Sequence, residues 1–525
     1  MLNLAMLLED HAGKYPDRDA IVFGGTRLTY AHLNAAACQV ANGLRARGIV
    51  PGDKVALSCP NVPFFPIVYY GILKAGAAAV PLNVLLSSRE IAYHLNDSDA
   101  KAYFCFEGGP GLPLNETGYA GFTEAGACQQ FILMTADPAA TSPFPGTTTL
   151  GALMQGQPTT FETAATDPDD TAVILYTSGT TGRPKGAELT HSNMLTNALV
   201  SRDLYLPKVR ERNVALMALP LFHVFGMTVV LNAVLFMGGT LVLMARFDAG
   251  AAFETMVQEQ VTFFSGVPTM YWGLLSHAQT TGMDTQPITD HLRLCISGGA
   301  ALPVELLHNF ERMFGVAILE GYGLSETSPV VCFNQLGFER KAGSIGRPVF
   351  GTEMRVVDDN DQDVPSGQPG EIIVRGHSVM KGYYKRPEAT DEAMRGGWFH
   401  TGDIAYRDGE GYYFIVDRKK DLILRGGYNV YPRELEEVLM THPAVSLAAV
   451  IGVPHEALGQ EVKAFIIRKP GVTVTVEEMT VWCRQQMAQY KYPRHIEFRD
   501  ALPMTATGKV LKRELAEQEA GRATT

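Results

Sequence analysis

The sequence lacks a basic excess and any cysteine pattern typical of disulfide or zinc frameworks. Lys and Arg total 44 against 55 Asp and Glu, giving a net charge of −11. Because nucleic acids are bound by basic surfaces, this balance excludes nucleic acid as an expected partner. The seven cysteines contain no CxxC pair in 525 residues. We therefore expect no disulfide scaffold and a reducing, cytoplasmic location.

The chain also lacks a long uninterrupted apolar run. Residues 214–245 contain no Asp, Glu, Lys or Arg, but Pro220, His223, Asn232 and the pair Gly238-Gly239 interrupt them. A membrane-spanning helix needs about 20 continuous apolar residues. We therefore predict strand, loop, buried helix and strand here, and no transmembrane segment. The sequence leaves open a peripheral contact with a membrane and a homodimer.

What is present is an alternation of short apolar strands with helical patterns. The run 64–74 predicts a helix between strands at 54–59 and 77–82, and further strands are expected at 171–178, 240–245, 261–267, 292–299 and 316–323. Such alternation is typical of βαβ units and parallel sheets, so the fold class is α/β.

The later part of the chain has a different pattern of expected secondary structure. Residues 343–417 read as short strands and turns, which predicts a small β-barrel-like unit within an N-terminal domain of residues 1–419. Residues 420–525 predict a small, mobile α+β domain. Its basic residues between 484 and 513 would suit a lid over an anionic ligand.

The strongest chemical motif is Tyr176-Thr-Ser-Gly-Thr-Thr-Gly-Arg-Pro-Lys-Gly186, directly after an expected strand. Small hydroxyl residues and glycines let consecutive backbone N–H groups surround a phosphate, and Lys185 adds a cation. The string is not a Walker loop, because Pro184 stands where that pattern needs a glycine before the lysine.

Weaker motifs follow at the ends of later strands. In Gly321-Tyr-Gly-Leu-Ser-Glu-Thr327, an aromatic ring framed by glycines can lie against a planar base, and Glu326 offers hard oxygens to Mg²⁺. In Gly397-Trp-Phe-His-Thr-Gly-Asp403, the carboxylate can accept hydrogen bonds from a ribose diol. Arg425-Gly-Gly-Tyr-Asn429 permits close backbone approach, and Thr505-Ala-Thr-Gly-Lys509 offers a lysine on a glycine-containing loop.

Together these motifs closely resemble the adenylate-forming acyl-CoA synthetases, a group within the superfamily that also contains firefly luciferase. The resemblance covers essentially the whole chain. The tracts ISGGAALPVE, LEGYGLSETSPV, GWFHTGD and DRKKDLILRGGYNVYPRELEEVL are similar in particular to bacterial long- and medium-chain fatty acid CoA ligases.

The resemblance implies a two-step reaction with ATP, Mg²⁺ and coenzyme A. A small-molecule carboxylic acid would attack the α-phosphate of ATP to give acyl-adenylate and pyrophosphate, and coenzyme A would then displace AMP. The residues implied in catalysis are Lys509, His223, Lys185 and Thr327, and Thr177 and Glu326 are implied to face Mg²⁺.

The resemblance also implies a set of contacts to ATP or coenzyme A. For the phosphates these are Thr177, Ser178, Gly179, Thr180, Thr181, Gly182, Lys185 and Thr327, and for the adenine Gly298, Gly299, Ala300, Glu320, Gly321 and Tyr322, with Gly323 as a further cofactor contact. Asp403 and Arg418 are implied to contact the ribose, Gly426 and Gly427 the pantetheine arm, and Lys509 the reacting groups. Lys420 is implied to be the hinge about which the C-terminal domain rotates.

The acid itself is less well specified. The segments similar to the pocket walls (222–230, 266–272 and 330–332) contain no Arg or Lys, which disfavours a diacid. We expect a medium- to long-chain fatty acid, with a cinnamate-, ferulate- or benzoate-type acid as the alternative. Other open readings are an enzyme that stops at the acyl-adenylate and a non-catalytic nucleotide-binding regulator.

Overall fold

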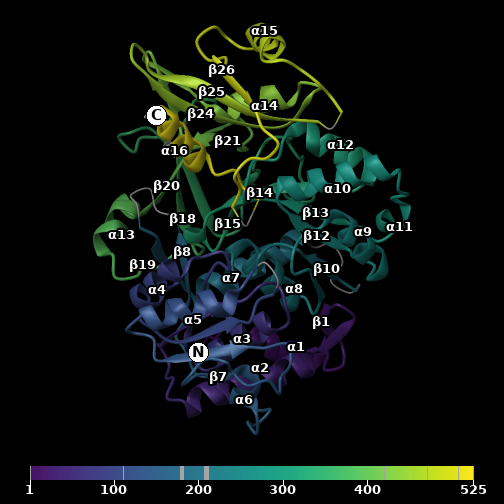
Figure 1. The fold of residues 1–525 in the computed structure, drawn as a ribbon, viewed down its shortest axis with the longest axis vertical. Coiled ribbons are helices and arrows are strands. Elements are labelled where there is room, and N and C mark those ends of the chain that lie inside the picture. The colour runs from purple at the N-terminus through teal and green to yellow at the C-terminus, as the bar shows by residue number, and fades with distance from the viewer. Residues whose placement is uncertain are drawn as a thin grey trace.

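Figure 1 shows the computed structural model, which describes residues 2–109, 112–177, 183–205, 212–418, 421–469, 471–505 and 508–523. The chain begins in the lower part of this view and ends in the smaller C-terminal part at the top. The expected α/β class, with a large N-terminal part and a small α+β C-terminal part, is confirmed.

The first large sheet is mostly parallel in its middle. Its strand order is β16-β15-β14-β13-β12-β10-β11-β1-β2. The bounds are β1 (Asp19–Phe23), β2 (Thr26–Thr29), β10 (Val214–Met217), β11 (Thr240–Leu243), β12 (Phe263–Gly266), β13 (Leu294–Ser297), β14 (Ile318–Gly323), β15 (Val330–Phe333) and β16 (Arg347–Pro348). Strands β10 to β13 are buried throughout, which explains their uninterrupted apolar sequences.

The second large sheet runs in the order β19-β9-β8-β4-β3-β5-β6-β7. The bounds are β3 (Lys54–Ser58), β4 (Ala78–Pro81), β5 (Ala100–Phe106), β6 (Gln130–Met134), β7 (Thr148–Thr149), β8 (Thr171–Thr177), β9 (Lys185–Thr190) and β19 (Gly382–Tyr383). Strands β8 and β9 form an antiparallel hairpin, so the glycine- and threonine-rich string is the loop of a hairpin.

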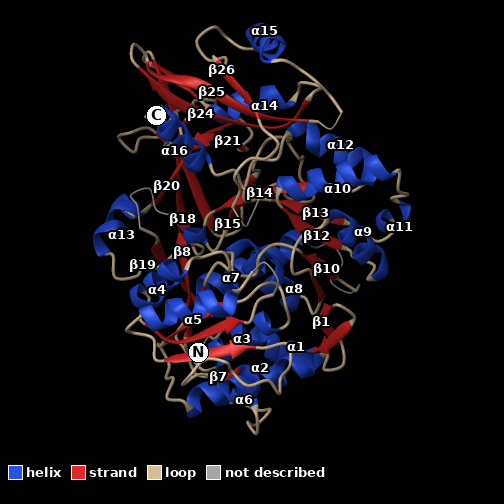
Figure 2. Cartoon of the chain, viewed as in Figure 1, coloured by secondary structure: helices blue, strands red, loops and turns tan. Residues whose placement is uncertain are grey.

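Helices pack between and outside the two sheets (Figure 2). Helix α2 (Tyr30–Ala46) contacts β1 and β2, α3 (Phe64–Lys74) contacts β3 and β4, and the two helices pack on each other. Other helices of this part are α1 (Met6–Lys14), α4 (Ser88–Asp97), α5 (Leu114–Glu124), α6 (Leu150–Met154), α7 (His191–Tyr205), α9 (Ala249–Gln258), α10 (Pro268–Thr281), α11 (Gln286–Thr289) and α12 (Val304–Phe314).

The uncharged stretch 214–245 folds as expected, with one unexpected detail. After β10 and a turn, the buried helix consists of a π-helical segment η1 (Phe225–Asn232) and α8 (Ala233–Phe236), followed by β11. Every residue of η1 is buried. Within the described residues no helix combines the length and apolarity needed to cross a bilayer. All seven cysteines are free and buried.

The smaller units complete the molecule. Strands β17 (Thr352–Val357), β18 (Gly370–Gly376), β20 (Phe399–Arg407) and β21 (Tyr413–Arg418) form an antiparallel sheet, accompanied by α13 (Pro387–Ala393) and the short turn η3 (Arg395–Gly397). The C-terminal part contains β22 (Ile423–Arg425), β23 (Tyr428–Val430), α14 (Pro432–Met440), β24 (Val445–His455), β25 (Gly459–Arg468), α15 (Val476–Gln486), β26 (His495–Phe498) and α16 (Lys512–Ala523). It has a hydrophobic core of its own.

Candidate active site

Three side chains converge where β8 and β9 meet the short helix η2 (Ser325–Thr327). Thr177 and Lys185 are paired across the β8–β9 hairpin. The Thr177 hydroxyl donates to Glu326 Oε1 at 3.1 Å, and the Tyr383 hydroxyl donates to the same oxygen at 3.0 Å. The Lys185 ammonium lies 4.4 Å from the centre of the Tyr383 ring. The structure thus brings together Thr177, Lys185 and Glu326, and adds a tyrosine that the sequence motifs did not indicate.

Several predicted contacts cannot be located. Ser178, Gly179, Thr180, Thr181, Gly182 and Lys420 lie outside the described residues.

Glycines keep the ends of β13 and β14 close together. A Cβ atom on Gly298 would lie 3.3 Å from the Gly321 carbonyl oxygen, and one on Gly321 would lie 2.1 Å from the Phe333 ring. At Gly323 the corresponding distance to the Pro329 oxygen is 1.7 Å. Only glycine fits at Gly321 and Gly323 without movement of neighbours. Next to this edge, Gly299 and Ala300 are exposed and half-buried, respectively.

Glu320 is a buried carboxyl group on β14. Its residue is 5% exposed, and Oε1 accepts a hydrogen bond from the Leu302 N–H at 3.4 Å. The backbone N–H of Gly343 also interacts with this carboxyl group, and Oε2 is fully buried. Burial raises the pKa of Glu320 to about 7, opposed by Arg433 of α14. It faces a small cavity of about 70 Å³.

Tyr322 and Asp403 connect this edge to the small antiparallel sheet. The Tyr322 hydroxyl donates to Asp403 Oδ2 at 2.5 Å, and Arg418 Nε lies 3.0 Å from Asp403 Oδ1. Asp403 and Arg418 are cross-strand neighbours on β20 and β21. The Asp403 carboxylate raises the pKa of Arg418 above its ordinary value. Each carboxylate oxygen has further lone pairs, so the predicted ribose contact is compatible with these bonds.

Thr327 belongs to the turn that holds η2, and its predicted place near the α-phosphate stays a prediction. It is 0% exposed. Its hydroxyl donates to the Pro329 oxygen at 2.6 Å and accepts from the Leu324 N–H at 2.9 Å. These two hydrogen bonds of the hydroxyl stabilise the turn that holds η2. Ser325, directly before Glu326, is half-buried and is the more accessible hydroxyl of this turn.

His223 is held as a neutral imidazole. Burial, with a smaller effect of the Lys509 ammonium, lowers the pKa of His223 to about 4. Its Nδ1 accepts the Phe225 N–H at 3.3 Å, which places the remaining ring proton on Nε2. His223 can therefore donate a hydrogen bond from Nε2 at neutral pH.

The Lys509 loop reaches from the C-terminal part to the first large sheet. In Figure 1 the yellow chain extends down toward β14. A Cβ on Gly508 would lie 2.5 Å from Thr269 Oγ1, at the start of α10, and Gly508 has a φ of +73°. The Lys509 charge acts on His223. The structure therefore brings Lys509 to the same edge as His223.

Gly426 and Gly427 occupy a different place. They form the exposed turn between β22 and β23, with φ values of +56° and +85°. The Gly426 N–H donates to the Leu458 oxygen at 2.8 Å, within the C-terminal part itself. Their predicted contact with the pantetheine arm stays a prediction.

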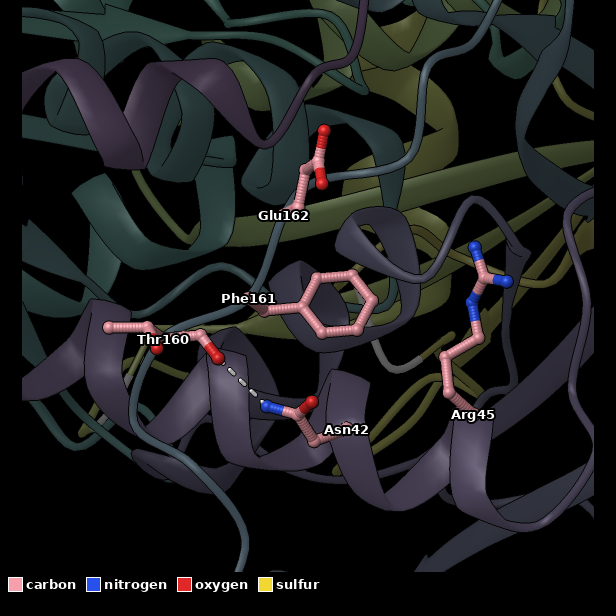
Figure 3. Close-up of a pocket in the computed structure, with 5 residues that line it drawn as sticks. All are labelled: Asn42, Arg45, Thr160, Phe161 and Glu162. Atoms are coloured by element: carbon pink, nitrogen blue, oxygen red, sulfur yellow. Dashed lines mark hydrogen bonds between the residues drawn. The ribbon is translucent and has the colours of Figure 1, made fainter.

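A larger hollow lies away from this site. It has a volume of about 750 Å³ and lies between α2 and the segment before β8 (Figure 3). Its lining residues are Asn42, Arg45, Thr160, Phe161 and Glu162, and Asn42 Nδ2 donates to the Thr160 oxygen at 2.9 Å. None of the predicted site residues lines this hollow, so we do not assign the active site to it.

Two protein families match this chain. Residues 8–384 match the family described as AMP-binding enzyme, and residues 434–509 match the AMP-binding enzyme C-terminal domain. The first match contains Lys185 and Glu326, and the second ends at Lys509.

Individual relatives match over nearly the full length. The long-chain-fatty-acid–CoA ligase of Bacillus subtilis (strain 168) is 37% identical over 539 residues, covering 98% of this chain and 94% of the relative. The feruloyl-CoA synthase of Amycolatopsis sp is 38% identical over 511 residues, covering 95% and 96%. The crystal structure of the anthranilate CoA ligase AuaEII in complex with anthranoyl-AMP superimposes with a TM-score of 0.91 at 30% identity, covering 100% of this chain and 98% of that one.

Proposed function

Because this chain belongs to the AMP-binding enzyme family, we propose that it activates a medium- to long-chain fatty acid with ATP and transfers the acyl group to coenzyme A. The chain is an AMP-forming acid–CoA ligase, for which ATP and CoA are substrates. We further propose which acid is used and which role each site residue has.

The observation that carries the site assignment is the meeting of Thr177, Lys185 and Glu326. A carboxylate is a poor acyl donor, so the first step must join two anions, the acid and the α-phosphate. Lys185 would compensate charge on the phosphates. The Glu326 carboxylate and the Thr177 hydroxyl are hard oxygen donors that fit Mg²⁺, which would neutralise phosphate charge when bound.

The metal would depend on the nucleotide for further ligands. Among the described residues, no group of three or more His, Cys, Asp or Glu side chains is arranged to hold an ion. Mg²⁺ is commonly held by one or two carboxylates together with substrate phosphates. A single carboxylate at Glu326 therefore fits a metal that arrives with ATP.

The remaining roles follow from the contacts described. Asp403 and Arg418 would hold the ribose, and Glu320 would lie beside the adenine. Thr327 would lie near the α-phosphate, with the half-buried Ser325 in the same turn. A neutral His223 would donate to the acid, and Lys509 would offset charge between the acid and the phosphate.

Apolar surroundings support the fatty acid. Phe222, Phe225 and Met227, in the segment that resembles a pocket wall, are buried hydrophobic residues, and the same is true of Val330 and Cys332. The resemblance to a long-chain-fatty-acid–CoA ligase favours the same choice. An aromatic acid is the second candidate, because a feruloyl-CoA synthase is 38% identical.

A substrate screen tests this proposal. Pyrophosphate exchange and CoA-dependent AMP release would be measured with straight-chain, cinnamate-type, benzoate-type and dicarboxylic acids. We expect kcat/KM to be highest for medium- to long-chain straight acids, with thioester formed in step with AMP. A clear preference for aromatic acids would replace the fatty acid, and exchange without thioester would overturn the ligase step.

A further inference from the structure

The Tyr383 side chain contacts both charged residues of the cluster formed by Thr177, Lys185 and Glu326. Its hydroxyl donates to Glu326 Oε1 at 3.0 Å, and its ring lies 4.4 Å from the Lys185 ammonium. We infer that Tyr383 is a positioning residue that fixes the Glu326 carboxylate and the Lys185 cation relative to each other. This inference rests on the proposed roles of Glu326 and Lys185.

The backbone around Tyr383 is built to hold this position. Strand β19 pairs with β9, with Tyr383 opposite Ala187, and the Tyr383 N–H donates to Thr390 Oγ1 at 2.9 Å. The Met380 N–H donates to the Glu326 backbone oxygen at 2.8 Å. Segment 380–383 thus holds Glu326 through both its backbone and its side chain, while it is paired with the strand that begins at Lys185.

Two hydroxyl donors on one oxygen determine the orientation of the carboxylate. Thr177 and Tyr383 both donate to Glu326 Oε1, and they come from different strands, β8 and β19. Hydrogen bonds of this kind orient a metal-facing carboxylate before the metal and substrate arrive. Tyr383 is 8% exposed, so water competes little for its hydroxyl.

The tyrosine ring adds a second effect. An ammonium group over an aromatic face is stabilised by the ring quadrupole. The ring therefore favours one location of the Lys185 cation beside the hydroxyl-bound carboxylate. Tyr383→Phe removes only the hydrogen bond, whereas Tyr383→Leu removes the ring as well.

The neighbouring Tyr384 provides a matched control. Its hydroxyl donates to Asp99 Oδ2 at 2.7 Å, and its ring is near Lys54 and Lys385 rather than Lys185. Tyr384→Phe removes an equivalent tyrosine-to-carboxylate bond one residue away, from a different carboxylate.

The test measures how ATP binding and pyrophosphate exchange depend on Mg²⁺. Calorimetric titration of the full-length protein with ATP, in EDTA and at graded Mg²⁺ concentrations, gives a readout that does not require turnover. We expect Tyr383→Phe to raise, by about 5- to 10-fold, the Mg²⁺ concentration at which the Mg²⁺-dependent increase in ATP affinity is half complete. ATP binding in EDTA should be unchanged. Tyr383→Leu should in addition weaken ATP binding in EDTA, because the Lys185 cation loses its location.

The variants also separate this inference from the proposed function. The role of Tyr383 would be overturned if Tyr383→Phe and Tyr384→Phe showed the same Mg²⁺ dependence of ATP binding. It would also be overturned if Tyr383→Phe lowered only the thermal unfolding temperature. Glu326→Gln should shift the Mg²⁺ dependence at least as strongly. If Glu326→Gln left the Mg²⁺ dependence of ATP binding unchanged, both the proposed metal-facing role of Glu326 and this inference would be overturned. If Glu326→Gln changed that dependence and Tyr383→Phe did not, only this inference would be overturned.

Discussion

Glu320 shows how a single buried group links the site to stability. Its carboxyl group is 5% exposed, and the pKa is raised to about 7 mainly by burial. In the unfolded chain a glutamic acid ionises near pH 4.5. Between these two values the unfolded state loses its proton first, so stability falls as pH rises from about 4.5 to about 7 and then levels off.

Glu320→Gln should remove this pH dependence. The amide cannot ionise, so the variant should be more stable than the wild type at pH 8 by about 3 kcal/mol at most, with a much smaller difference at pH 4.5. Denaturant unfolding of the full-length protein at both pH values measures the change. Glu353→Gln, at an exposed position on β17, is the control and should show no such trend. The same difference at both pH values for Glu320→Gln would contradict the argument.

At the scale of elements, the site depends on strands that end close together. β13 and β14 are parallel, with Ser297 opposite Glu320, and β14 then pairs with β15 in the antiparallel direction. Gly321 lies where β14 changes partner, and its Cα faces the Phe333 ring. The glycine of this motif is therefore needed for strand packing.

Gly321→Ala should destabilise the protein and weaken ATP binding. The added Cβ would lie 2.1 Å from the Phe333 ring, which must move. Overpacking of this kind costs about 1–3 kcal/mol. Thermal unfolding and calorimetric ATP titration measure both effects. Gly409→Ala is the control, since no atom lies within 4 Å of its added Cβ. Equal behaviour of the two variants would show that β14 tolerates a side chain here.

At the scale of the whole molecule, charged groups attach the C-terminal part to the rest. Lys512, at the start of α16, lies 2.8 Å from Glu436 of α14. Burial opposes its charge, but Glu436 and Asp417 keep the pKa of Lys512 above its ordinary value. Asp417 is the penultimate residue of β21 in the small sheet, and its Oδ2 accepts the Arg433 N–H at 2.9 Å. The Asp417–Arg433 hydrogen bond and the attraction between Asp417 and Lys512 link the C-terminal part to the small sheet, whereas the Lys512–Glu436 pair lies within the C-terminal part.

Lys512→Met should weaken this arrangement. Without the cation, the Glu436 and Asp417 carboxylates would repel each other, so pyrophosphate exchange should slow several-fold. Thioester formation from supplied acyl-adenylate should change less, because the proposal assigns Lys509 to the first step. Arg513→Met is the control, since its side chain is 78% exposed and pairs with Glu517 inside the same helix. Equal rates for the two variants would exclude an attachment through Lys512.

The amino-acid sequence by itself determined the fold class and the main chemical groups. Helix 64–74 and the strands beginning at Lys54 and Thr171 were predictable because periodicity and apolar runs reflect local burial. Lys185, Glu326 and Asp403 were identifiable because their motifs are contiguous in the chain.

Only the tertiary structure decided which of these groups meet, and through what. The Tyr383 contact with Glu326 and the Tyr322 contact with Asp403 join residues 57 and 81 positions apart. The burial of the Thr327 hydroxyl and the approach of Gly508 to Thr269 likewise depend on how separate elements pack. Local patterns carry no information about such distances, because side chains far apart in sequence are brought together by the burial of the whole core.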